Sequence, residues 1–191
     1  MTSLEYRRAI KQDFKKMLEL QNKNFISSIP PENLSNGFLS TQFTEEDFEE
    51  TNKELCVAVC MKSQKLIAYL CATSFRFNEK FLILSKIPKE LKNCLFQNKA
   101  VLSYSSFIAS PACIDSNYRA QGILLELSIT LLKNLSKNHE IAITLVAQEN
   151  ERSLKTVKKL GFTLLKTFIL NNKTYVIFAC NLNDFISHHA S

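Results

Sequence analysis

Hydrophobic and polar residues alternate along most of the chain with spacings that predict short strands and amphipathic helices. In the first half, the segments with such a pattern are a strand over residues 4–10, helices over 13–24 and 44–52, and strands over 55–61 and 66–74. Thr44 and Asp47 have the spacing of a capping box, which marks the start of the second helix. The polar residues 62–65 between the two strands predict a hairpin.

The middle of the chain is less regular. Apolar residues over 77–98 are interrupted by Pro88, which predicts two short helices broken at the proline. Residues 100–114 follow as a long strand-like stretch. Pro111 within it indicates a bulge or the end of edge pairing, because proline cannot donate to a strand ladder.

The last third alternates clearly between helix and strand. Its segments are a helix over 122–135, a strand over 141–146, a helix over 153–160, and a hairpin of strands over 162–170 and 175–180. Gly161 ends the second of these helices. This order predicts an α/β fold with at least one parallel strand pair, and the length of 191 residues fits a single domain over residues 1–191.

Composition narrows the possible classes of protein. The apolar fraction of 46% and the charged fraction of 22% are ordinary for a globular protein. We expect a cytoplasmic protein without a membrane partner, because no apolar run approaches the roughly 20 residues of a membrane span and the first residues lack the apolar stretch of a secretory signal. The six cysteines form no Cys-x-x-Cys pair, which predicts reduced, buried thiols and no metal site.

The net charge of +6 is compatible with nucleic acid or with a ligand that carries several phosphates. The basic residues are dispersed along solvated helix faces, and no ribonucleoprotein or helix-turn-helix motif accompanies them. We therefore expect no nucleic-acid partner.

The candidate chemistry lies between residues 114 and 123, where a strand ends near Ile114 and a helix begins at Gly122. The first amides of a helix have no internal partners and carry partial positive charge. A glycine at this place lets a diphosphate approach the main chain without meeting a Cβ atom, and Arg119 adds a cation. The segment therefore predicts a phosphate-binding turn.

Two motifs in this part of the chain resemble those of the GNAT-type N-acetyltransferases. The first is their acetyl-CoA loop, R/Q-x-x-G-x-G/A, which is matched in all but the last place by Arg119-Ala120-Gln121-Gly122-Ile123-Leu124. The second is an Asn, a small residue three positions later and a terminal Gly-Phe, matched by Asn150, Ser153 and Gly161-Phe162. The resemblance extends from about residue 105 to 180. It implies a mixed, mostly antiparallel central sheet with a splayed parallel pair, flanked by helices.

The resemblance also implies an activity: transfer of an acetyl group from the cosubstrate acetyl-CoA to a primary amine by direct attack, without a metal. The implied cofactor-binding residues are Cys113, Ile114, Arg119, Ala120, Gln121, Gly122, Ile123, Asn150 and Ser153. Main-chain groups around Cys113 and Ile114 would pair with the pantetheine arm. The amides of residues 119–123 would hold the pyrophosphate, and Asn150 would hydrogen-bond the pantetheine, with Ser153 near its outer portion.

The chain departs from the family where catalysis is concerned. Many relatives have a tyrosine seven residues after the Asn, where it protonates the leaving thiolate, and this chain has Val157. Residues 103–112 contain no Asp or Glu that could act as the base. The local candidates to accept the proton of the amine, directly or through water, are Tyr104, Ser106 and Ser110.

These departures leave two hypotheses open, an N-acetyltransferase and a non-catalytic acyl-CoA-binding protein with a regulatory or partner-binding role. Small amines, antibiotics, amino acids, peptide N-termini and protein lysines all remain as acceptors, and both a monomer and a homodimer are compatible with the sequence. Cys113 has no histidine near it in sequence, so we expect a buried structural thiol rather than a nucleophile. Phe38, Phe75 and Phe77 are candidates to line an acceptor pocket.

Overall fold

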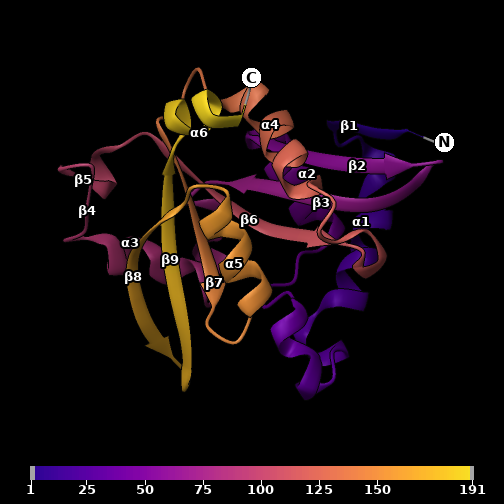
Figure 1. Cartoon of the computed structure of the whole chain (residues 1–191), viewed down its shortest axis with the longest axis horizontal. Coiled ribbons are helices and arrows are strands. Elements are labelled where there is room, and N and C mark those ends of the chain that lie inside the picture. The colour runs from indigo at the N-terminus through magenta and orange to yellow at the C-terminus, as the bar shows by residue number, and fades with distance from the viewer. Residues whose placement is uncertain (1–2, 190–191) are drawn as a thin grey trace.

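The computed structural model describes residues 3–189, and its centre is a seven-stranded sheet with the order β1-β2-β3-β6-β7-β9-β8 (Figure 1). The strands are β1 (Leu4–Arg8), β2 (Cys56–Lys62), β3 (Lys65–Thr73), β6 (Ser106–Ile114), β7 (Ile141–Ala147), β8 (Thr163–Leu170) and β9 (Lys173–Asn181). Neighbouring strands are antiparallel except β6 and β7, which are parallel. The predicted fold class, a mixed and mostly antiparallel sheet with one parallel pair, is confirmed.

Helices cover both faces of the sheet. They are α1 (Lys11–Asn24), α2 (Glu45–Glu54), α3 (Ile87–Leu91), α4 (Ile123–Leu135), α5 (Glu151–Lys159) and α6 (Leu182–His189). Side chains alternate between the faces of a strand, so Val57 and Val59 of β2 pack with α1 and α2, whereas Ala58 and Cys60 pack with the leucines of α4. On β7, Ala142 packs on the α4 side. Val146 lies four residues later and therefore on the same face of the strand, and it packs with α5. Thus α4 and α5 share one face, and α1 and α2 lie on the other.

Several helix ends form as the sequence predicts. The Thr44 hydroxyl accepts from the Asp47 N–H at 3.1 Å, and the Asp47 carboxylate accepts from the Thr44 N–H at 2.8 Å, which confirms the capping box. Gly161 ends α5 with a φ of +86°. None of the helices within residues 3–189 has the length and apolar character needed to cross a membrane.

The middle of the chain differs from the prediction. Pro88 lies in the first turn of α3, so it begins this helix rather than breaking one, because the N–H that proline lacks has no partner at a helix start. Short 3-10 turns precede α3, and a small hairpin of β4 (Leu95–Phe96) and β5 (Lys99–Ala100) follows it. The predicted long strand begins only at Ser106, and α6 was not predicted at all.

The predicted bulge in β6 is confirmed. Leu70 of β3 lies opposite Ala112 and Ala72 lies opposite Ala109, so Ser110 and Pro111 interrupt the ladder. A bulge changes which edge of the strand the main-chain groups face. It therefore sets the geometry of the opening that follows along β6.

Candidate functional site

The parallel strands β6 and β7 separate halfway along their length. They pair only over Ser106–Ile108 with Ile141–Ile143. At the point of separation, the Thr144 hydroxyl donates to the carbonyl oxygen of Ala109 at 3.0 Å. Beyond this contact, no strand within residues 3–189 pairs with residues 110–114 on the β7 side, so this edge of β6 is open.

Alternation along β6 determines which main-chain groups face the opening. The Asp115 N–H donates to the Ile67 carbonyl of β3 at 2.8 Å. Because successive residues of an antiparallel strand direct their main-chain groups to opposite edges, those of Ala112 and Ile114 point away from β3. Cys113 lies opposite Tyr69 and directs its own groups toward β3. The groups that face the opening therefore belong to Ala112 and Ile114, whereas those of Cys113, one of the two residues expected there, face β3. The Ile114 carbonyl already accepts from the Arg119 guanidinium at 3.1 Å, so Ile114 offers its N–H to the opening.

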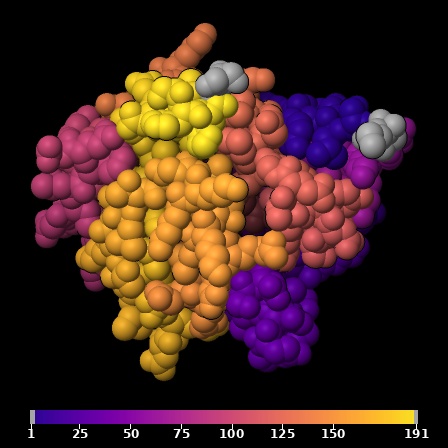
Figure 2. Space-filling model, in the orientation of Figure 1, coloured from indigo at the N-terminus to yellow at the C-terminus, as the bar shows by residue number. Residues whose placement is uncertain are grey.

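A cavity of about 500 Å³ occupies the space between the separated strands. Its wall consists of β6, the end of β7, α5, the segment 37–41 and the segment 118–125, of which the predicted site residue Gln121 is the one member that does not line the cavity. Figure 2 shows the molecular surface hollowed between α5 and the segment around residues 115–125. The cavity thus reaches from the helices on one face of the sheet to the α1–α2 connection on the other.

The start of α4 presents unpaired main-chain donors to this cavity. Within the described chain, the N–H groups of residues 120–125 donate no hydrogen bond. Ala120 and Gly122 have φ angles of +62° and +76°, which curl the turn so that successive N–H groups form a concave surface. A Cβ atom added at Gly122 would find no atom within 4 Å, so the space in front of it is open. This geometry suits an anion such as a diphosphate.

Arg119 lines the cavity and ties the turn to other segments of the chain. Its guanidinium donates to the carbonyls of Ile114 at 3.1 Å and of Asn36 at 2.6 Å, and to the Asn24 side-chain oxygen at 2.7 Å. Three of its five N–H donors are therefore engaged within the chain. Burial lowers the pKa of Arg119, and the nearby Arg152 lowers it further. The residue predicted to contact the pyrophosphate thus also ties the turn to α1 and to the segment before Gly37.

Asn150 performs a comparable bridging role at the start of α5. Its side-chain oxygen accepts from the Ser153 N–H at 3.1 Å, and its amide donates to the Phe38 carbonyl at 3.0 Å. The residue is only 5% exposed. Both polar ends are used to cap α5 and to hold the segment 37–41 against it.

The candidates for proton transfer are distributed unevenly around the cavity. Ser110 lines it at the bulge of β6. Tyr104 and Ser106 do not line it: the Tyr104 hydroxyl donates to the Phe96 carbonyl at 2.8 Å, and Ser106 pairs with Ile141. Val157 is buried among apolar neighbours and brings no hydroxyl to the place of the family tyrosine.

Cys113 is buried, with its sulfur 3.9 Å from the Leu20 carbonyl oxygen. Burial raises the pKa of its thiol to about 12, although the charge of Arg119 opposes the shift. The thiol is therefore protonated at neutral pH, which agrees with the expected structural role.

The cavity also includes residues that the sequence reasoning missed. Thr144 interrupts the apolar run of β7, and this polar residue in a buried strand was the available signal. Arg152, Lys155 and Lys159 line the wall formed by α5, and His189 contributes from α6. Among the three candidate aromatic residues for an acceptor pocket, only Phe38 lines the cavity. Residues 3–189 bring together no group of three potential metal ligands.

Comparison with known proteins supports the fold. No family model matches the sequence, and no curated protein sequence matches it either. Solved structures do match. An N-acetyltransferase from Staphylococcus aureus Mu50 has 15% identity and a TM-score of 0.62, over 95% of this chain and 99% of that one. The yncA protein of Salmonella typhimurium, solved with its cofactor acetyl-CoA, has 12% identity and a TM-score of 0.63, over 95% of each chain.

A third match is the acetyltransferase of the GNAT family from Streptococcus pneumoniae, with 13% identity and a TM-score of 0.61, over 94% of this chain and 99% of that one. The chain has the GNAT fold. Identities this low establish the arrangement of the chain and not its activity. Within this GNAT fold, the cavity lies where β6 and β7 separate, and the unpaired amides at the start of α4 border it.

Proposed function

We propose that the chain is an N-acetyltransferase that moves an acetyl group from acetyl-CoA to a primary amine by direct attack. The observation that carries the proposal is a single cavity that joins a free strand edge, a turn of unpaired amides and an opening toward the α1–α2 connection. The residues present suit acetyl-CoA, because its pantetheine arm is an amide chain and its diphosphate is an anion. When bound, acetyl-CoA supplies an acyl group activated as a thioester.

Main-chain groups provide most of the proposed binding. N–H groups of residues 120–125 bind the diphosphate, since Ala120 and residues 122–125 line the cavity and these N–H groups have no acceptor within the described chain. The main-chain groups of Ala112 and the N–H of Ile114 pair with the pantetheine amides as an added strand would. Arg119 and Asn150 hold the chain around residues 36–38 in place on either side of the cavity. Arg119 does so from the turn before α4, through the Asn36 carbonyl, and Asn150 does so from α5, through the Phe38 carbonyl.

The acceptor enters from the α1–α2 side, where Phe38, Leu39 and Leu84 present apolar surface and Ser40 and Thr41 present hydroxyls. No carboxylate lies among the described residues that line the cavity. A lysine-like amine, with a pKa near ~10.4, is almost wholly charged at pH 7 and would have to lose its proton before attack. We therefore propose an acceptor amine that arrives uncharged. As its nitrogen bonds to the acetyl carbon, the C–S bond breaks and coenzyme A leaves as a thiolate that takes a proton from water, while Ser110 or Thr144 passes the proton of the amine to water.

The test is thiol release from acetyl-CoA across a panel of primary amines with different pKa values, alongside calorimetric titration of CoA. The proposal expects CoA binding and thiol release with at least one weakly basic, apolar amine. Failure of CoA to bind would overturn it.

A non-catalytic acyl-CoA-binding protein is the second candidate, and Val157 favours it because this side chain has no proton to give to a leaving thiolate. The same assay separates the two functions. CoA binding without thiol release for any amine of the panel would favour the second.

A further inference from the structure

One face of α5 directs a row of cations at the cavity. The row consists of Arg152, Lys155 and Lys159, and all three line the cavity, whereas Lys158 does not. With 3.6 residues per turn, positions i, i+3 and i+7 fall within an arc of roughly 60°, and the row extends about 10 Å along the helix. The row is therefore long enough to meet two separate anionic groups.

The charge of this row is largely uncompensated within residues 3–189. Lys155 lies 3.5 Å from the Glu151 carboxylate, but both side chains are exposed, and such pairs contribute little to stability. Arg152 and Lys159 make no salt bridge within this range. The cavity wall contributes no Asp or Glu over the same range. A bound anion would relieve the mutual repulsion.

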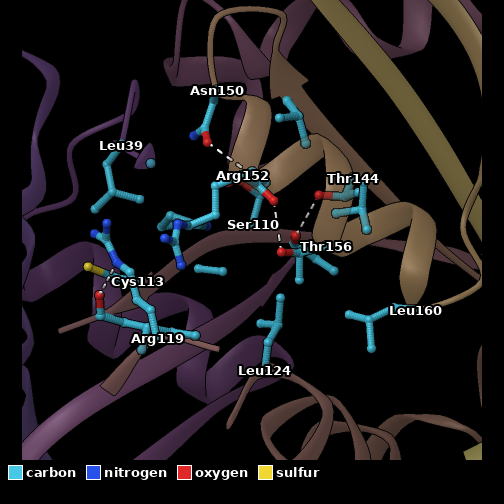
Figure 3. A pocket seen from close by; sticks show the side chains of 18 of the residues that line it. Leu39, Ser110, Cys113, Arg119, Leu124, Thr144, Asn150, Arg152, Thr156 and Leu160 are labelled. Atoms are coloured by element: carbon cyan, nitrogen blue, oxygen red, sulfur yellow. Dashed lines mark hydrogen bonds between the residues drawn. The ribbon is translucent and has the colours of Figure 1, made fainter. Parts of the chain in front are cut away.

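The two ends of the row lie beside different parts of the cavity. Leu160, next to Lys159, packs in the same apolar cluster as Ile123 and Leu124 at the start of α4. At the other end, a Cβ atom placed on Gly37 would lie 3.7 Å from the Arg152 Cδ atom and 3.5 Å from an Arg119 nitrogen. Figure 3 shows Arg152 and Arg119 approaching each other on the side of Leu39, away from Leu124 and Leu160. The row thus runs along the cavity from the segment 37–41 to the amides of α4.

Coenzyme A requires more positive charge than the turn supplies. Its diphosphate can be bound by the amides of residues 120–125, which carry only partial charge. Arg119 has three donors committed to the chain. A monoester phosphate adds a charge of roughly −1.5 to −2 near pH 7, which needs formal cations nearby.

We propose that the cationic face of α5 binds the 3′-phosphate of coenzyme A and thereby selects coenzyme A over its dephosphorylated form. The proposal rests on the proposed function, because it concerns the same ligand. Lys159 and Lys155 bind the phosphate as point charges. Arg152 extends the positive charge of this helix face toward Arg119.

The experiment measures the dissociation constants of CoA and 3′-dephospho-CoA by calorimetry for the full chain and for three variants. These are Lys159→Gln, the double variant Lys155→Gln/Lys159→Gln, and Lys158→Gln as the matched control. Glutamine preserves helix propensity, and all three lysines are exposed, so the variants should fold. We expect the unmodified chain to bind CoA about tenfold or more tightly than 3′-dephospho-CoA, and this preference to shrink in 0.5 M NaCl because salt screens exposed charges.

The double variant should lose most of this preference with little change in its affinity for 3′-dephospho-CoA, whereas Lys158→Gln should retain it. Equal binding of the two nucleotides by the unmodified chain would overturn the inference and leave the proposed function standing. An equal loss in Lys158→Gln and Lys159→Gln would also overturn it, because the effect would then be one of net charge. If neither nucleotide binds, the proposed function fails as well.

Discussion

Gly122 and Gly161 offer a matched pair of substitutions that isolates the diphosphate site. Both have positive φ angles, +76° and +86°, and a Cβ atom added at either would find no atom within 4 Å. Gly122 lines the cavity, whereas Gly161 ends α5 outside the lining. Gly122→Glu and Gly161→Glu therefore impose the same backbone strain and the same new charge, and only one introduces them at the proposed site.

The strain can be estimated from the backbone alone. An L-residue in the left-handed region costs roughly 1–2 kcal/mol. For a chain of this length, 1 kcal/mol changes Tm by roughly 2–4 °C. Without ligand, we therefore expect both variants to melt roughly 2–8 °C below the unmodified chain, and by similar amounts because neither site contains a steric clash.

The ligand distinguishes the two variants. CoA at 100 times its Kd stabilises a binding-competent chain by about 2.7 kcal/mol, which raises Tm by roughly 5–11 °C. Gly161→Glu should keep this shift. Gly122→Glu should lose it, because a carboxylate in the open space before residues 120–125 repels the diphosphate and can itself accept from the free amides.

Differential scanning fluorimetry with and without CoA measures these shifts, and titration calorimetry at one temperature checks them independently. If Gly122→Glu retained a CoA-induced shift equal to that of Gly161→Glu, the diphosphate could not lie at the start of α4. Loss of the shift in both variants would instead point to general damage to α5 or the sheet.

Four further outcomes follow from the same structure. Cys113→Ala should preserve CoA binding and turnover, because the thiol is buried and protonated; complete loss of turnover with normal CoA binding would contradict this. Asn150→Ala should reduce the free energy of unfolding by about 2–4 kcal/mol in a urea titration, since it removes a helix cap and leaves the Phe38 carbonyl unpaired. A loss below about 1 kcal/mol would argue against the proposed role of Asn150 in joining α5 to Phe38. The midpoint of kcat/KM against pH should move with the pKa of the acceptor amine, and a midpoint common to all acceptors would reveal a base on the protein. Burial acts to raise the pKa of Asp13, but hydrogen bonds from Arg7 hold this pKa below its ordinary value. The Asp13 carboxylate therefore stabilises the fold above pH ~4 and contributes less as the pH falls further. Asp13→Asn should flatten that part of the profile of stability against pH, measured by acid titration of circular dichroism.

The motifs of the last third predicted a turn with free amides before α4, and they could do so because their information is local. A glycine before a helix, with no competing cap residue, leaves the first amides free, and the structure confirms this at Gly122. The bulge at Pro111 is equally local, since proline lacks the donor that the ladder needs. Pro88 was misread because the same residue can end one helix or begin another, and the surrounding apolar pattern did not distinguish the two.

Residues with several possible partners were less predictable. Arg119 could donate to a phosphate or to carbonyl groups, and its position in the motif says nothing about Asn24 or Asn36, which lie far away in the sequence. Lys155 and Lys159 were interpreted, with Lys158, as an ordinary solvated helix face. The cavity that Lys155 and Lys159 line forms only when α5 packs beside α4.

By itself, the sequence determined the periodic segments, the helix ends and the conformational freedom at Gly122, because each depends on residues within a few positions of one another. The tertiary structure alone decided where β6 leaves β7, that the segment 37–41 borders the cavity, and that Asn150 reaches the Phe38 carbonyl. The physical reason is that these contacts join segments up to 112 residues apart. Such contacts form when the packing of the whole sheet and its helices brings the segments together, and no local pattern of hydrophobic and polar residues encodes them.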